Sequence, residues 1–226
     1  MKALDDVLID AVISDDCNRA RQALRDGGFV NTKVGDGETA LHLAAKRGNR
    51  TMAELLIRAN CFVDAIDWQE NTPLHFAARE GVKDVVDVLL RSHATVNAHN
   101  ADGESPLFLA AKRGSDDVVA ALLASGATVD AMDRLNQTPL HQAAARGSKN
   151  TVEMLLKGGA NPLATDKYGR RPIQLAWSEG NQAVVDALVY AEPDRGEAFG
   201  KVQVPDRAHF TRQRHRADVG SEGISR

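Results

Sequence analysis

Cysteine is scarce in this chain. Cys17 and Cys61 are the only two cysteines among 226 residues, and they lie far apart without a CxxC pair. This scarcity argues against a disulfide framework and against a zinc site, and it suits a reducing compartment. We therefore expect no metal and no other cofactor.

Long apolar runs and a strong excess of one charge are also lacking. No run approaches the roughly 18 apolar residues that a membrane span requires, and the first residues lack the basic and apolar segments of a secretory signal. The formal net charge of −3 indicates no attraction of the whole chain to DNA or to an anionic membrane. We expect a cytoplasmic protein that does not contact membranes; a nuclear location is the alternative.

What the sequence does contain is a ten-residue phrase that recurs five times at intervals of 33 residues. The copy at residues 72–81 reads Thr-Pro-Leu-His-Phe-Ala-Ala-Arg-Glu-Gly. The copies begin at Thr39, Thr72, Ser105, Thr138 and Arg171. Self-similarity at this period indicates stacked supersecondary units rather than one globular core.

Each unit is predicted to contain two helices. In residues 67–99, Thr72 can cap a first helix, and Pro73 suits the first helical position. Gly81 ends this helix, because glycine enters a left-handed C-cap without penalty. A second helix begins at about Lys83, and an extended loop leads to the next unit. One helix pair cannot bury its own apolar face, so neighbouring units must stack.

These residues resemble the ankyrin repeat, whose pattern is T-P-L-H-x-A-A-x-x-G followed by V-V-x-x-L-L-x-x-G-A-x-V-N. The resemblance covers roughly residues 34–190. It implies an all-α solenoid of about six stacked helix-loop-helix units joined by β-hairpin-like loops. It also implies a concave face, made of hairpin tips and first helices, that binds other proteins.

The units are expected to differ at the two ends of the stack. A degenerate N-terminal capping unit lacks the Thr-Pro-Leu-His motif, and in the C-terminal capping unit Trp177 replaces the second alanine. A polar, disordered tail follows; its alternative is a linear motif, either a nuclear signal at 212–216 or a strand at 201–204. The predicted boundaries are 1–33, 34–66, 67–99, 100–132, 133–165, 166–192 and 193–226.

Histidines recur in register, but they do not indicate a metal site. His42, His75 and His141 come from separate units, and Phe108 and Gln174 replace them in two copies. The family resemblance implies structural hydrogen bonds near the start of each first helix. No glycine-rich phosphate loop or nucleophile elbow occurs either. We therefore expect no catalytic activity.

The candidate functional residues are those that the scaffold does not need. Large apolar side chains are expected to be exposed at or just before the hairpin tips, at Ile66, Trp68, Met132, Leu135 and Tyr168. Gln69 lies beside Trp68. Aromatic anchors dominate protein interfaces, so we predict a partner-binding role. The alternative is the ordinary scatter of apolar residues on a surface.

Glu70 departs from the repeat in the same hairpin. Its slot holds Gly37, Gly103 and Gly169 in other units, and Asn136 once. A slot that needs a positive φ would cost Glu roughly 1–2 kcal/mol relative to Gly. Either this loop has a different shape, or strain is tolerated because the tip has a role.

Basic residues recur in the last turns of the first helices, and we call them the basic floor. They are Lys46, Arg47, Arg79, Lys112, Arg113 and Arg146. Glu80 and Glu179 interrupt them. Cations at helix C-termini also interact favourably with the helix dipole, by about 0.3–1 kcal/mol each, which is the structural alternative. If the floor is functional, the partner segment is acidic and binding weakens as salt rises.

The leading hypothesis is a non-catalytic scaffold or adaptor, monomeric by itself, that binds a partner protein on its concave hairpin and first-helix face. One alternative is a structural component or regulatory subunit that docks through the C-terminal tail. Nucleic-acid binding by the basic floor is a further alternative. The near-zero net charge and the lack of interleaved aromatic residues argue against it.

Overall fold

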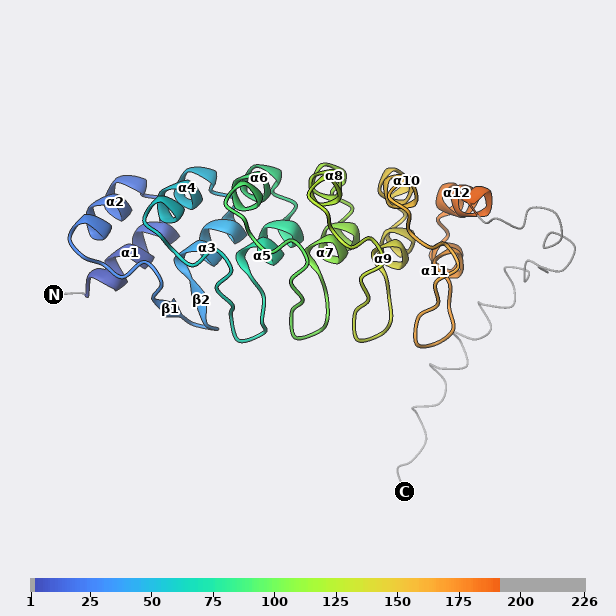
Figure 1. The fold of residues 1–226 in the computed structure, drawn as a ribbon, viewed down its shortest axis with the longest axis horizontal. Helices are drawn as coiled ribbons and strands as arrows, with labels where there is room; N and C mark the ends of the chain where they lie inside the picture. Colours follow the sequence, from blue (N-terminus) through green and yellow to red (C-terminus); the bar gives the residue numbers. More distant parts are fainter. Residues whose placement is uncertain (1–2, 192–226) are drawn as a thin grey trace, which may run out of the picture. The chain divides into compact units, whose positions relative to one another are not determined.

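The computed structural model describes residues 3–191, which form two parallel rows of helices (Figure 1). The row of first helices comprises α1 (Leu4–Ile13), α3 (Ala40–Arg47), α5 (Pro73–Glu80), α7 (Pro106–Arg113), α9 (Pro139–Arg146) and α11 (Pro172–Ser178). The row of second helices comprises α2 (Cys17–Arg25), α4 (Arg50–Arg58), α6 (Lys83–Arg91), α8 (Asp116–Ala124), α10 (Lys149–Lys157) and α12 (Gln182–Ala191). The chain is therefore an all-α repeat solenoid, as predicted. The expected tail at 193–226 lies outside the described residues.

Local chemistry sets the limits of the helices where the motif predicts them. The helix α5 starts after Thr72, whose N–H donates to Nδ1 of His75 in a reciprocal capping box, with Pro73 at the first turn. It ends at Gly81, which has a φ of 68°. The second helix starts at Lys83, also as predicted. The residues of the motif thus determine where these helices start and end.

The core runs through the stack between neighbouring helices of the same row. Paired alanines of the first helices, such as Ala77 and Ala78, are completely buried. The second helices add branched side chains, such as Val85, Val86 and Leu89, which are completely buried as well. Small residues on the first helices allow close approach, and larger ones fill the space between the second helices. Each unit is therefore stabilised by its neighbours.

Hairpin-like loops project from the first-helix side (Figure 1). The first contains strands β1 (Lys33–Val34) and β2 (Glu38–Thr39), which pair antiparallel with Lys33 opposite Thr39 and Val34 opposite Glu38. The later loops close with a backbone hydrogen bond at the same place; in one, the N–H of Asp67 donates to the carbonyl of Asn71 at 3.1 Å. The loops also bond to one another, because the N–H of Trp68 donates to the carbonyl of Asp36 at 2.9 Å. Equivalent bonds at 2.8–3.0 Å join Ala101 to Gln69, Arg134 to Asp102 and Lys167 to Leu135.

Candidate partner-binding surface

Each hairpin loop has three residues at its turn, which we call its tip. The tips are 35–37, 68–70, 101–103, 134–136 and 167–169. The residue before most tips is an Asp or Asn whose side chain holds the loop; Oδ1 of Asp67 accepts the N–H groups of Gln69 and Asn71, both at 2.8 Å. The carboxylate is thereby used by the scaffold, whereas the tip side chains Trp68 and Gln69 are exposed.

The same arrangement changes the ionisation of Asp166. Burial disfavours its charged form, but this is outweighed by hydrogen bonds from Nε of Arg170 at 2.8 Å and from the N–H groups of Arg170 and Tyr168, both at 2.9 Å. The pKa of Asp166 is consequently lowered to about 2. The last hairpin therefore keeps this internal ion pair at any physiological pH.

Trp68 and Tyr168 are the most exposed aromatic side chains of the tips. Trp68 is 73% exposed, and Tyr168 is 64% exposed. The indole lies against Gly37 of the preceding hairpin, since a Cβ added to Gly37 would lie 2.7 Å from Cδ1 of Trp68. The ring of Tyr168 has Nζ of Lys167 at 5.0 Å and Cζ of Arg170 at 4.9 Å from its centroid. Both rings are held by neighbours and remain open to solvent.

The other predicted anchors divide into exposed and half-buried residues. Ile66 and Met132 are exposed at 46% and 49%, and Gln69 is exposed beside Trp68. The expected exposure of Leu135 is wrong, because its side chain is only partly accessible. The following hairpin is bonded along this residue, with the N–H of Lys167 donating to the Leu135 carbonyl at 2.9 Å. The same bond occurs at Gln69 and Asp102, which are exposed, so the bond does not by itself account for the lower accessibility of Leu135.

Glu70 adopts the left-handed conformation of its glycine counterparts. Its φ is 61°, compared with 56° for Asn136 and 85° for Gly37. Its N–H donates to the Asp67 carbonyl at 3.2 Å, as that of Gly103 does to Asn100 at 2.9 Å. The alternative of a differently shaped loop is therefore excluded, and the strain of about 1–2 kcal/mol remains.

The basic floor is not an unopposed basic stripe. Lys46 and Lys112 bind carboxylates that precede their own helices, Glu38 at 3.3 Å and Glu104 at 3.0 Å. Glu80 lies between two further cations, 3.9 Å from Nε of Arg79 and 4.0 Å from Nη1 of Arg113, and Arg47 lies 3.8 Å from Asp15. Among the described residues, Arg146 is the one member of the floor without an ion pair. The floor is largely neutralised, which the sequence pattern did not indicate.

Phe76 underlies part of this floor. The side chain is only 3% exposed, and it lies beneath two cations, with Cζ of Arg79 at 4.5 Å and Nζ of Lys46 at 5.6 Å from the ring centroid. His42 meets the same ring edge-on at 5.6 Å. The charged heads therefore cover an aromatic ring that packs with the core, which is a structural role.

The three repeated histidines make structural hydrogen bonds. Nδ1 of His42 accepts the N–H of Thr39 at 3.0 Å, and Nε2 lies 2.9 Å from the carbonyl of Asn71 in the next unit. His75 and His141 repeat this geometry, and burial lowers the pKa of all three imidazoles, that of His75 to about 4. They are neutral at physiological pH. Within residues 3–191, no group of three or more His, Cys, Asp or Glu side chains is placed to hold a metal ion.

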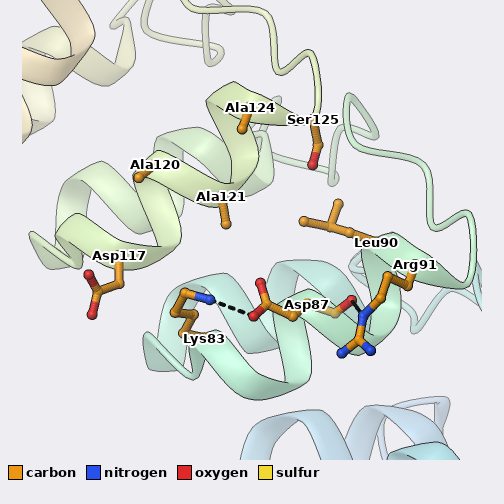
Figure 2. A pocket seen from close by; sticks show the side chains of 9 residues that line it. All are labelled: Lys83, Asp87, Leu90, Arg91, Asp117, Ala120, Ala121, Ala124 and Ser125. Atoms are coloured by element: carbon orange, nitrogen blue, oxygen red, sulfur yellow. Dashed lines mark hydrogen bonds and ion pairs between the residues drawn. The ribbon is translucent and has the colours of Figure 1, made fainter.

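A depression of about 480 Å³ lies between α6 and α8, on the second-helix side (Figure 2). Lys83 and Asp87 form an ion pair on one wall, and Arg91 donates to the Asp87 carbonyl at 3.0 Å. Alanines of α8, including Ala120 and Ala124, make the opposite wall. Lys83, Asp87 and Arg91 are bonded to one another, and Asp117 lines the depression without a bond to them. The depression therefore has no catalytic arrangement of side chains.

Three exposed aromatic residues were not singled out from the sequence: Phe29, Phe62 and Tyr190, the last of which is 69% exposed in α12. Phe29 is 58% exposed and Phe62 is 65% exposed, each in the loop that follows a second helix. Their slot holds Thr95, Thr128 and Asn161 in the later units. An aromatic residue at 29 and 62, where the later units have a polar residue, was the sequence signal that could have identified them.

Its stacked helix pairs with projecting hairpins place this protein in the class of repeat solenoids. The family model for ankyrin repeats (three copies) matches residues 8–100, 68–133, 83–166 and 107–197. The chain belongs to the ankyrin repeat family. No curated protein matches it significantly. Ankyrin repeats are generally protein–protein interaction modules and are typically non-catalytic. Within residues 3–191, no helix has both the length and the apolar character needed to span a bilayer.

Proposed function

We propose that this protein is a non-catalytic adaptor that binds a partner protein through its hairpin tips and the adjoining first helices. The observation that carries the proposal is the exposure of Trp68 and Tyr168 on tips whose backbone is held in place from unit to unit. Large aromatic residues contribute most to binding when a partner buries them.

Neither aromatic residue is needed by the hairpin that carries it, since the slot of Tyr168 holds Gln69, Asp102 or Leu135 in other units. The slot of Trp68 holds Ala101, Arg134 and Lys167 in other units, and the loops of all four close with the same backbone hydrogen bond. Because the scaffold accepts any of these side chains, its stability does not explain a tryptophan. Ile66 and Met132, on the same side of the stack, add further exposed apolar surface. Exposed apolar groups gathered on one side of a protein mark interaction sites.

A pair of matched variants tests the proposal. Trp68→Ala with Tyr168→Ala removes the two tip aromatics, and Phe29→Ala with Phe62→Ala removes two equally exposed rings from other loops. Each variant is used as bait for affinity capture with mass spectrometry. The Trp68/Tyr168 variant should capture at least about tenfold less partner than the wild type, since two hot-spot aromatics are removed. The Phe29/Phe62 variant should capture as much as the wild type.

Equal capture by all three baits, with unchanged circular dichroism, would exclude the tip surface. The same assay distinguishes binding through the tips from the alternative, docking through residues 193–226. Deletion of that segment should leave capture through the tips unchanged. Loss of capture on deletion alone would favour the tail.

A further inference from the structure

The row of hairpin tips changes the sign of its charge between the third and the fourth tip. Asp36, Glu70 and Asp102 are the only charged residues of the first three tips. Arg134 and Lys167 are the only charged residues of the last two. We call these sets the acidic tips and the basic tips. The sign change does not follow from the family motif, which leaves these slots open.

All five side chains are exposed, and none has an ion-pair partner within residues 3–191. This distinguishes them from the basic floor, where most cations are paired. It also distinguishes them from Asp67 and Asp166, whose carboxylates are buried and accept hydrogen bonds from their own loops. The tips thus carry exposed charges that remain available to a partner.

The two aromatic anchors reinforce this division. Trp68 has no cation over its ring within the described part of the chain, and Glu70 follows two residues later on the same tip. An aromatic face beside a carboxylate suits an arginine or lysine side chain. The ring of Tyr168 already lies between Lys167 and Arg170. That end presents cations and suits carboxylates.

We infer that the partner contributes an extended segment with separated charges, placing a basic side chain at Trp68 and Glu70 and acidic side chains at Arg134 and Lys167. This inference rests on the proposed function and adds the chemistry and the orientation of the partner. The basic floor alone suggested a uniformly acidic partner segment. The acidic tips would repel such a segment, so the inferred segment carries both charges.

The repeat spacing sets the length of this segment. Three units separate the tip of Trp68 from that of Tyr168, and packed helices lie about 8–10 Å apart. The two ends are therefore about 24–30 Å apart. An extended chain advances about 3.3 Å per residue, so about seven to nine residues link the basic and acidic groups of the partner.

Synthetic peptides provide a direct test with the full-length protein. The probe carries three arginines, a glycine–serine spacer of about eight residues and three glutamates, with a nitroxide label at either end. A label at the glutamate end should attenuate backbone amide signals near residues 134–170. A label at the arginine end should attenuate those near residues 36–70. A probe without the spacer should bind at least about tenfold more weakly, because it cannot reach both ends.

Charge reversal supplies the matched comparison. Arg134→Glu with Lys167→Glu should weaken probe binding at least about tenfold, through like-charge contact. Lys149→Glu with Lys157→Glu changes the net charge equally on α10, in the row of second helices, and should change binding less than about twofold. A probe with lysines in place of its glutamates should bind the Arg134/Lys167 variant better than the wild type.

Several results would overturn the inference. One is that both labels attenuate the same amides, and another is that the Lys149/Lys157 reversal weakens probe binding as much as the Arg134/Lys167 reversal. The inference would also be wrong if the probe did not bind in low salt, or if a single-stranded oligonucleotide displaced it from the basic tips. Capture of a protein that requires Trp68 and Tyr168 but ignores every charge reversal would also contradict it. That last result would leave the proposed function standing.

Discussion

His75 joins two consecutive units through its two ring nitrogens. Nδ1 accepts the N–H of Thr72 at 3.0 Å, and Nε2 lies 3.1 Å from the carbonyl of Glu104. Because Nδ1 accepts, the proton resides on Nε2 and the ring is neutral. Protonation of Nδ1 would remove its acceptor and would place a charge in the core. One residue thus links the start of a helix to the stack.

This geometry predicts that acid destabilises the protein. Burial lowers the pKa of His75 from its ordinary value of 6.5 to about 4, so the unfolded state binds more protons in this range. The free energy of unfolding should therefore decrease as pH falls from 7 toward 4, by about 1 kcal/mol at pH 5.5 from His75 alone. Urea unfolding at pH 7.5 and 5.5 measures the change. His42 and His141 act in the same direction, since their pKa values are also lowered.

His75→Gln is the control, because a glutamine already occupies this slot in the last unit. There, Oε1 of Gln174 accepts the N–H of Arg171 at 2.8 Å. The variant should lose about 1 kcal/mol less than the wild type between the two pH values. Equal losses would show that His75 is not the titrating group.

At the scale of elements, the hairpin loop combines a shared backbone frame with tip residues that vary between units. Its leading side chain, its closing bond and the positive φ of its third tip residue are shared between units. The first two tip residues vary in size and charge without altering this frame. The loop therefore separates residues that hold its shape from residues that are free to bind.

Glu70→Gly should stabilise this loop. Glycine adopts the φ of 61° found here without the steric cost of about 1–2 kcal/mol. Because glycine also adds conformational freedom to the unfolded chain, worth about 0.4–1 kcal/mol, the net rise in the free energy of unfolding should be about 1 kcal/mol. Gln69→Gly is the matched change at a residue without a positive φ. It should lower stability by about 0.4–1 kcal/mol, because glycine adds conformational freedom to the unfolded chain. Chemical denaturation of both variants decides; a loss of stability in Glu70→Gly would contradict the assignment of strain.

For the whole stack, stability is a sum of contacts between nearest neighbours. Units inside the stack bury both sides, whereas the units at the ends have one neighbour. Trp177 in the last unit is half-buried where inner units carry a fully buried alanine such as Ala144. Disturbance of an inner unit should therefore spread in both directions, and disturbance of an end unit should stay local.

Two leucine-to-alanine substitutions that create comparable cavities, one in an inner unit and one in an end unit, test this expectation. Leu89 in α6 and Leu188 in α12 are both almost completely buried, and truncation to alanine costs about 2–5 kcal/mol at such sites. Leu89→Ala should speed hydrogen exchange from α3 to α8. Leu188→Ala should speed it only in α11 and α12. Uniform acceleration in both variants, measured by mass spectrometry, would indicate one cooperative unit instead.

Much of this architecture was predictable from residues that act within a few positions of themselves. Thr72, Pro73 and Gly81 start and end a helix by local capping, and the 33-residue period requires stacking. The positive φ at Glu70 was predictable too, because glycine fills its slot in three other units. Such features depend on backbone conformation, which nearby residues largely control.

The state of the candidate surface depended instead on contacts between units. Arg113 is balanced by Glu80, and Arg47 by Asp15, each about one unit away along the chain. Leu135 is only partly accessible, although Gln69 and Asp102 in the same slot of other tips are exposed. A charge pattern read along the chain predicted a basic floor. Pairing depends on distance in space, and in the folded stack the floor is largely neutralised while the tips keep their unpaired charges.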